Sequence, residues 1–133
     1  MATVDKLTML HMAVKDLDKE KKFYADQLGF KVTGDLTYDK DQAAKAGVPA
    51  GSRWISMELP GGGTTISLTN VYENMQPGSL KLQLSASNIE AICDELKARG
   101  VKLAHEVTHA GWSTWFDFTD PEGNQWVVVE SKQ

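Results

Sequence analysis

The order of predicted elements occurs twice along the chain, and this internal repeat limits the fold more than any other feature. The first half combines extended runs with one helical segment, in the order 7–14, 17–28, 30–32, 53–59 and 64–69. The second half has the same plan, in the order 80–86, 89–99, 101–103, 114–118 and 125–130. Because corresponding elements are roughly 70 residues apart, the sequence predicts two similar β-α-β-β-β modules.

Signals at the helix ends support the two predicted helices. Asp16 stands where a carboxylate can cap the first amide groups of the helix in the first half. Gly29 follows that helix, at a position where glycine readily adopts a left-handed conformation. In the second half, Ser87 and Glu90 have the spacing of a capping box, so the second helix is expected to begin there.

Two further segments are less regular. The segment 39–50 is compatible with a short helical turn or with a loop, and 70–79 contains a Pro-Gly pair typical of a linker. A second turn is predicted at 120–124, where proline presets one backbone angle and Gly-Asn tolerates a positive φ. These segments separate the predicted elements without adding a third module.

The single cysteine, Cys93, lies on the apolar stripe of the second helix. We expect it to pack as a small hydrophobic side chain and not to act as a nucleophile. One cysteine excludes an internal disulfide, which favours a reducing compartment. The N-terminus lacks an apolar signal region and no run is long enough to span a membrane, so a soluble, cytoplasmic protein is predicted.

The charge pattern argues against a nucleic-acid-binding role. The 14 basic residues are outnumbered by 18 acidic ones, giving a formal charge of -4. Binding to nucleic acid needs a concentrated basic surface. The densest basic group, Lys19, Lys21 and Lys22, lies among acidic residues, which is typical of a solvated helix face.

Motifs from both halves, taken in order, carry a resemblance to a known family. They are Val14-Lys15-Asp16-Leu17-Asp18-Lys19 with Phe23-Tyr24 and Leu28-Gly29-Phe30, then Glu95-Leu96-Lys97-Ala98-Arg99-Gly100-Val101, and finally Asp120-Pro121-Glu122-Gly123-Asn124. With this order and spacing, the sequence resembles the glyoxalase / bleomycin-resistance / extradiol dioxygenase group, the vicinal oxygen chelate superfamily. The resemblance covers nearly the whole chain, and Arg53-Trp54 is similar to one uncharacterised branch of the group.

The resemblance implies an α+β fold in which two βαβββ modules form a curved mixed sheet around a cavity. Residues 1–133 would form one domain, with module one at about 5–70 and module two at about 79–132. Members of this group are often homodimers in which the partner subunit completes the cavity. A homodimer is therefore also implied.

The usual metal ligands of the group are missing from the matching positions. In metal-dependent members, four inward-facing side chains, typically His and Glu, bind one divalent ion. The matching residues here are Met9, Ser67, Lys81 and Val127. None of them is such a ligand, so the resemblance implies no metal and no cofactor for this chain.

Histidines offer substitute ligands. His11 lies on the same strand face as the first matching position, and a metal site made from His11, Glu58 and Glu130 is an alternative to a pocket-lining His11. His105 and His109 are four residues apart, but no helix is predicted there to bring them onto one face. We do not expect a metal pair at these two residues.

Polar and aromatic residues on the predicted strands and near their ends are the candidate ligand contacts. They are His11, Trp54, Ser67, Lys81, Gln83 and Trp112. Lys81 and Gln83 share one face of a strand with period two, and they either line the pocket or are simply solvated. Trp54 and Trp112 can stack on a planar ligand, a contact that contributes about 0.5–1.5 kcal/mol beyond burial.

Two functions that use the cavity fit these residues, and a stand-alone interaction module whose cavity is vestigial is a third possibility. The first is a binding protein of the bleomycin-resistance type, which sequesters a planar or cationic compound at a dimer interface without metal and so gives antibiotic resistance. The second is a metal-dependent lyase, isomerase, dioxygenase or thiol transferase that uses noncanonical ligands. The missing ligands and the tryptophans favour the first, and the sequence does not decide whether the chain catalyses a reaction.

Overall fold

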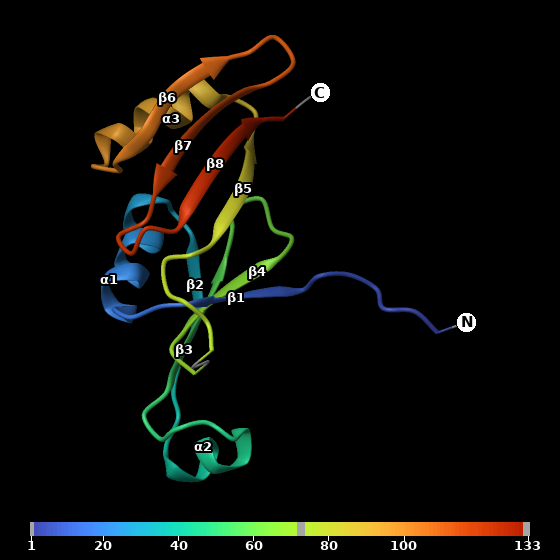
Figure 1. The fold of residues 1–133 in the computed structure, drawn as a ribbon, viewed down its shortest axis with the longest axis vertical. Coiled ribbons are helices and arrows are strands. Elements are labelled where there is room, and N and C mark those ends of the chain that lie inside the picture. The colour runs from blue at the N-terminus through green and yellow to red at the C-terminus, as the bar shows by residue number, and fades with distance from the viewer. Residues whose placement is uncertain (1, 72–73, 132–133) are drawn as a thin grey trace. The chain divides into compact units, whose positions relative to one another are not determined.

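The computed structural model describes residues 2–71 and 74–131. Its fold is α+β, as predicted, and it contains two four-stranded mixed sheets (Figure 1). Contacts within the chain define two compact units, residues 1–75 and 76–133. In the described residues, no helix is long and apolar enough to cross a membrane.

The first unit contains one sheet, a helix on one of its faces and an inserted second helix. Its elements are β1 (Met9–Ala13), α1 (Leu17–Lys22), the π-helical turn η1 (Phe23–Gln27), β2 (Lys31–Thr37), α2 (Lys40–Ala46), β3 (Arg53–Glu58) and β4 (Thr65–Thr69). The strands lie in the order β1-β4-β3-β2, where β1 and β4 are parallel and the other pairs antiparallel. This is the predicted β-α-β-β-β plan with α2 added between β2 and β3.

The core of the first unit lies between α1, η1 and one face of the sheet. Alternate strand residues are buried there because successive side chains point to opposite faces. The buried strand residues of this face are Met12, Ile55, Met57, Ile66 and Leu68, and Ala13, Ser67 and Thr69 are buried on the opposite face. Tyr24 of η1 is fully buried and stacks on Phe30 with ring centroids 5.5 Å apart. Asp16 accepts a hydrogen bond from the Lys19 amide, which confirms its predicted capping role.

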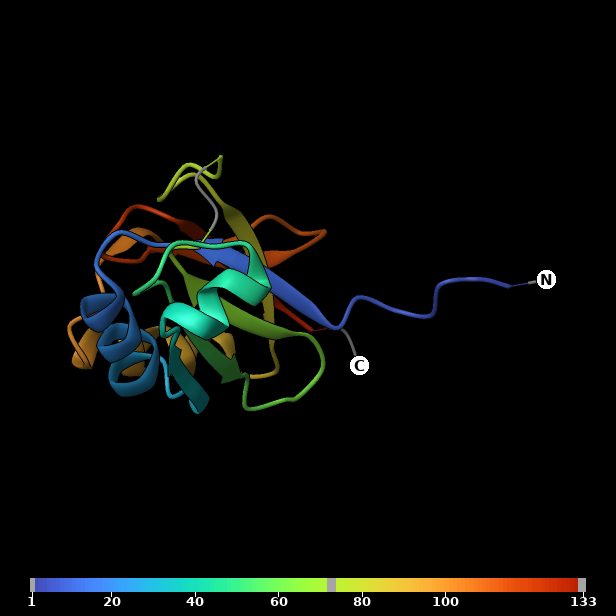
Figure 2. The same ribbon diagram turned by 90° about the horizontal axis from the view of Figure 1, so that it is seen from below.

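The segment 39–50, for which a helical turn and a loop were both compatible with the sequence, contains helix α2. Asp39 and Gln42 cap it reciprocally: the Gln42 amide donates to Asp39 Oδ1 at 2.8 Å, and the Asp39 amide donates to Gln42 Oε1 at 3.0 Å. Figure 2 shows α2 as a short helix in teal, separate from α1 in blue. The capping box explains why so short a segment is helical.

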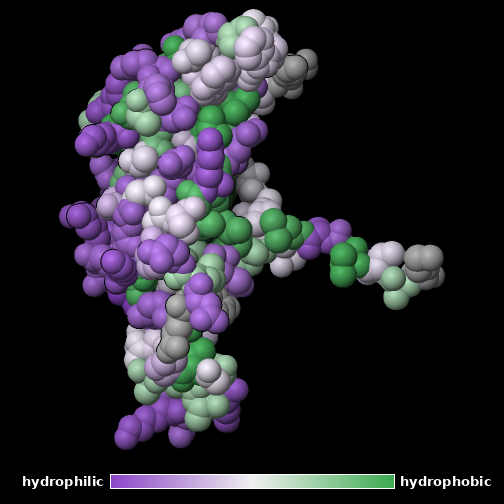
Figure 3. Space-filling model, in the orientation of Figure 1, coloured by the Kyte–Doolittle hydropathy of each residue, from purple (hydrophilic) through white to green (hydrophobic). Residues whose placement is uncertain are grey.

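An extended segment precedes β1. Residues 2–8 are exposed, and they include the apolar side chains of Val4, 97% exposed, and Leu7. The segment runs outward from β1 in both ribbon views (Figures 1 and 2), and its apolar residues are green in Figure 3. Its last two residues are hydrogen-bonded to the rest of the unit: Thr64 Oγ1 donates to the Leu7 carbonyl at 3.2 Å, and the Thr65 amide donates to the Thr8 carbonyl at 3.0 Å.

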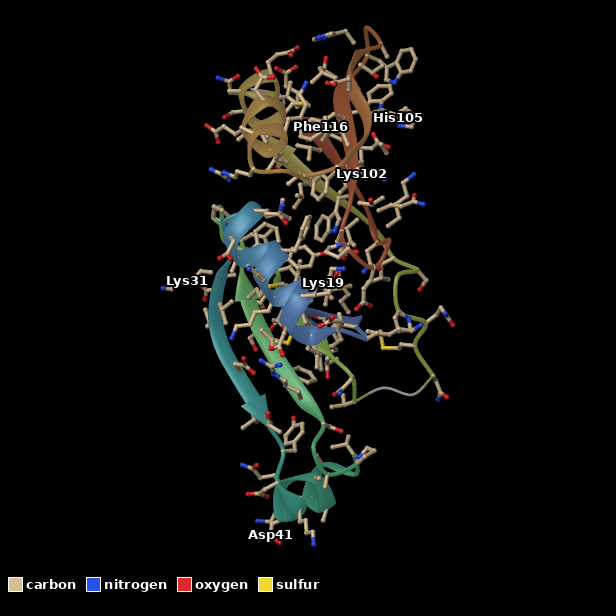
Figure 4. All side chains as sticks on the ribbon, turned by 90° about the vertical axis from the view of Figure 1, so that its left-hand side faces the viewer. Lys19, Lys31, Asp41, Lys102, His105 and Phe116 are labelled. Carbon is tan, nitrogen blue, oxygen red and sulfur yellow. The ribbon has the colours of Figure 1, made fainter. Side chains whose placement is uncertain are left out.

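The second unit repeats this plan without an inserted helix. Its elements are β5 (Lys81–Ala86), α3 (Ile89–Ala98), β6 (Leu103–His109), β7 (Thr114–Thr119) and β8 (Gln125–Glu130). The strand order is β5-β8-β7-β6, and β5 and β8 are parallel. Phe116, Phe118 and Trp126 are buried under α3 together with Cys93, whose burial confirms the prediction. Figure 4 shows Phe116 between α3 and the strands.

Two local predictions for the second unit are wrong. Asn88, not Ser87, caps α3, because its side chain accepts a hydrogen bond from the Ala91 amide; Glu90 binds His109 instead of reaching back to the cap. Strand β6 is longer than the predicted 101–103 and extends to His109. Its pairing with β7 contains two irregularities, which interrupt the two-residue alternation that a sequence pattern detects.

The predicted turn at 120–124 holds two strands of the second unit together. Asp120 accepts hydrogen bonds from the Glu122 and Asn124 amides and from the Asn124 side chain. Asn124, fully buried, in turn accepts from the Leu80 amide at 3.0 Å. Nearby, a Cβ added at Gly78 would collide with the Glu122 backbone oxygen, and Gly78 has a φ of +76°.

Candidate functional site

The sheet of the first unit has one face toward α1 and a second face that carries polar and aromatic residues. In the strand ladder, His11 lies beside Ser67, and Ser67 lies beside Ser56. These three residues form one row across β1, β4 and β3. Trp54 is two residues before Ser56 on β3, so it belongs to the next row on the same face. The ladder pairs Trp54 with Leu36 of β2, which is therefore in that row too.

Four side chains on this face are connected directly. His11 Nδ1 and Ser67 Oγ are hydrogen-bonded at 2.7 Å, and the His11 ring contacts Trp54 edge-on with centroids 4.6 Å apart. Trp54 Nε1 donates to Ser56 Oγ at 3.2 Å. The structure therefore brings together the predicted contacts His11, Trp54 and Ser67, and it adds Ser56, which the sequence analysis did not single out.

The charged residues of the same strands lie on the opposite face, toward α1. Arg53 donates to both carboxylate oxygens of Asp35 at 2.8 and 2.7 Å, and Lys21 donates to Asp35 at 2.7 Å. The Arg53 guanidinium holds the pKa of Asp35 well below its usual range. These charged side chains lie on the helix side of the sheet, whereas the row of His11, Ser67 and Ser56 on the other face contains no carboxylate.

Two of the three predicted residues of the second unit are on the sheet face opposite α3. Lys81 and Gln83 are exposed and alternate with the half-buried Leu82 and Leu84, as the period-two pattern predicted. The ladder places Gln83 beside Val127 of β8, which in turn lies beside Asp117 of β7. Whether Lys81 and Gln83 contact a ligand stays a prediction.

The tryptophans of the second unit differ in position. Trp112 is 75% exposed in the turn between β6 and β7, whereas Trp115 is half-buried on β7 beside Val129 of β8. Trp115 has the same place in its sheet as Trp54, which lies beside Thr69 of β4. This equivalence was not among the sequence-based predictions, although Phe116 and Phe118 on either side of Asp117 already indicate the alternation of β7.

The strand register also indicates which residues occupy the positions of the usual metal ligands. The ladder pairs Ser67 with His11 and not with Met9, and it pairs Val127 with Gln83 and not with Lys81. The four equivalent ladder positions are therefore His11, Ser67, Gln83 and Val127. This set contains one imidazole and no carboxylate, so it does not fit the His and Glu ligands of the metal-dependent members. Among residues 2–71 and 74–131, no group of three or more His, Cys, Asp or Glu side chains is placed to hold a metal ion.

The other residues considered as metal ligands lie at exposed strand ends or close to a single carboxylate. Glu58 lies at the exposed end of β3, beside Lys31, and Glu130 lies at the exposed end of β8. His109 Nε2 is hydrogen-bonded to Glu90 at 2.9 Å, and His105 Nδ1 is 3.8 Å from Asp117 Oδ2. Each of these two histidines faces one carboxylate and not the other histidine.

Comparison with known proteins identifies the family. The model of the Glyoxalase/Bleomycin resistance protein/Dioxygenase superfamily matches residues 6–128, and the chain therefore belongs to this superfamily. A curated relative, the uncharacterized protein YetH of Bacillus subtilis (strain 168), is 24% identical over 121 residues, which cover 88% of this chain and 91% of YetH.

Solved structures agree with this assignment. TnmS3, an antibiotic binding protein from Streptomyces sp. CB03234, is 26% identical, has a TM-score of 0.80, and is matched over 99% of this chain and 100% of its own. A superfamily member from Sphaerobacter thermophilus DSM 20745 is 25% identical, with a TM-score of 0.75 and coverage of 96% and 98%.

Proposed function

We propose that this chain is a binding protein that sequesters a planar small molecule, with Trp54 as its aromatic platform. The observation that carries the proposal is the connected group of His11, Trp54, Ser56 and Ser67 on the sheet face opposite α1. Hydrogen bonds and the edge-on ring contact hold both aromatic side chains in place before a ligand arrives. A side chain that is already ordered loses little conformational entropy on binding, which favours affinity.

The chemistry of this group suits an aromatic ligand. A planar ring can stack on the Trp54 indole, while the hydroxyl group of the half-buried Ser56 is available at its edge. Ser67 is fully buried, and its part is to orient the His11 ring. None of these side chains forms the combination of nucleophile, base and orienting carboxylate that acyl transfer needs. Recognition accounts for the group without a chemical step.

The similarity to TnmS3 supports an antibiotic as the class of ligand. That protein binds an antibiotic, and its fold covers nearly the whole of this chain. Sequestration needs affinity alone, so the mismatch between the ladder positions and the usual metal ligands is consistent with a metal-free binding role. We extend the proposal to a homodimer in the cytoplasm that lowers the free concentration of a planar antibiotic.

Calorimetric titration with a panel of planar aromatic antibiotics tests this function. The wild-type protein should bind at least one compound; Trp54→Ala should weaken that binding by about tenfold, equivalent to 1.4 kcal/mol. Trp54→Phe keeps an aromatic ring and should retain most of the affinity. Absence of binding to every compound, or equal affinity of the wild-type and Trp54→Ala proteins, would contradict the proposal.

The homodimer and the absence of a metal are tested by separate measurements. Light scattering should give twice the chain mass of 14.6 kDa, and the monomer mass alone would contradict the homodimer. Metal analysis of the purified protein should show no stoichiometric divalent metal. If a metal is present and is lost in His11→Ala, the metal-free proposal is wrong.

A further inference from the structure

We propose that Trp115 and Asp117 form a second subsite, on the sheet face opposite α3, that selects planar ligands carrying a positive charge. The inference rests on the proposed function, since it concerns which planar molecules the protein prefers. The two residues lie on the same face of β7 because they are two positions apart on one strand. Together they present an aromatic ring and a carboxylate, the two groups that recognise an aromatic cation.

Asp117 lies in the middle of this face. Its neighbour on β8 is Val127, and its neighbour on the edge strand β6 is His105. The Asp117 side chain is 28% exposed, so it is partly withdrawn from water while still reachable. A carboxylate in such a position interacts more strongly with a cation than a fully solvated one does, because water screens the charge less.

The hydrogen bonding of Asp117 is incomplete. Oδ1 is buried and has no hydrogen-bond donor in the part of the chain that the structure describes. Oδ2 is 3.8 Å from Nδ1 of His105, which is beyond hydrogen-bonding distance, and the His105 side chain is 73% exposed. An unsatisfied buried acceptor is costly to keep in a folded protein and calls for a reason. A cation bound beside the partly exposed carboxylate supplies one, because its charge stabilises the whole carboxylate group.

Asp117 contrasts with its counterpart in the first unit. There, the equivalent position on β3 is Ser56, which accepts the Trp54 indole hydrogen bond. The two sheets thus present a tryptophan at the same place, one with a hydroxyl beside it and one with a carboxylate. The carboxylate is what makes the second face selective for charge.

The other charged groups of this face do not neutralise Asp117 through a close ion pair. Lys81 lies one row further along, on β5, with β8 between it and β7. His105 is the nearest basic side chain, and its imidazole can rotate away because it is largely exposed. A cationic ligand therefore meets a carboxylate whose charge is not compensated by a hydrogen-bonded cation.

Two probes with the same ring system and different charge test the subsite. At neutral pH, 9-aminoacridine is protonated and acridine is neutral. The wild-type protein should bind 9-aminoacridine about tenfold more tightly than acridine, and Asp117→Asn should remove this preference while leaving acridine binding unchanged. Trp115→Leu should weaken binding of both probes by a similar factor, because stacking does not depend on the charge.

A matched variant controls for net charge. Asp94→Asn makes the same change on the exposed surface of α3, away from this face, and should leave the preference intact. Circular dichroism should give the native spectrum for Asp117→Asn, since the amide is nearly isosteric with the carboxylate. A variant that fails to fold would contradict the inference, because Asp117 would then be required for structure.

The outcomes separate this inference from the proposed function. If the wild-type protein binds both probes equally and Trp54→Ala weakens them, planar binding stands and the charge-selective subsite is wrong. If 9-aminoacridine is preferred but Asp117→Asn keeps the preference, the subsite is also wrong. If neither probe nor any planar antibiotic binds, both proposals are contradicted.

Discussion

His11 and Ser67 are hydrogen-bonded across the parallel pair of β1 and β4, with Nδ1 and Oγ 2.7 Å apart. They are 56 positions apart in the chain. The bond sets the orientation of the His11 ring, and that ring is the edge-on neighbour of Trp54. The aromatic platform proposed for ligand binding therefore depends on a polar contact between the first and last strands of its sheet.

Replacing Ser67 by valine should weaken binding of a planar antibiotic without unfolding the protein. The variant removes the Oγ partner of His11, so the ring is less restrained; a hydrogen bond of this kind contributes about 1 kcal/mol, or roughly a fivefold change in affinity. Calorimetry measures the effect. Ser87→Val, an exposed serine-to-valine change before α3, should leave the affinity unchanged, and a loss as large as that of Ser67→Val would argue against the role of the bond.

The ion pairs of Asp35 should make stability depend on pH on the acid side. Arg53 and Lys21 hold the pKa of Asp35 below its unfolded value, so this contribution is present above about pH 4 and is lost as pH falls further. Asp35→Asn should lower the free energy of unfolding by about 1–2 kcal/mol at neutral pH. Urea unfolding at several pH values should show the difference shrinking below pH of about 4.

Asp5, on the exposed segment before β1, provides the comparison for this experiment. Asp5→Asn should leave the unfolding free energy within about 0.5 kcal/mol of wild type at every pH. A difference between Asp35→Asn and wild type that stays constant from neutral to strongly acidic pH would show that the carboxylate charge is not its cause.

Asn124→Ala should be strongly destabilising. The fully buried Asn124 side chain connects the Leu80 amide to the Asp120 carboxylate, and its removal leaves both without these hydrogen bonds in the interior. We expect a loss of about 2–3 kcal/mol. Asn88→Ala removes only an exposed helix cap and should cost about 0.5–1 kcal/mol. Thermal or urea unfolding measures both losses of stability. Equal losses for Asn124→Ala and Asn88→Ala would contradict the stabilising role of the buried Asn124 hydrogen bonds.

The thiol of Cys93 should be unreactive in the native protein. Burial on the inner face of α3 raises its pKa, and the nearby Glu106 carboxylate raises it further, so little thiolate is present at neutral pH. Ellman's reagent should modify it slowly in buffer and rapidly in urea. A double variant, Cys93→Ala with Ser85→Cys, places the only thiol on an exposed strand and should react quickly in buffer. Equal rates for the native wild type and this variant would contradict burial.

The sequence alone was sufficient for features that depend on near neighbours. The repeat of elements, the helix cap at Asp16, the burial of Cys93 and the alternation of Lys81 and Gln83 all follow from patterns a few residues long. Hydrophobic periodicity and capping act over one or two turns of chain, so they can be read locally. The α+β class was implied by the resemblance to the superfamily, which rests on motifs of the same local kind.

The tertiary structure decided which distant residues meet. The pairing of His11 with Ser67, the contact of His11 with Trp54, and the position of Trp115 rather than Trp112 in the place equivalent to Trp54 all depend on strand register. A shift of one residue would turn each of these side chains to the other face of its sheet, and no local pattern specifies that register. Long-range packing of each sheet against its helix selects it, because only one register buries the apolar face.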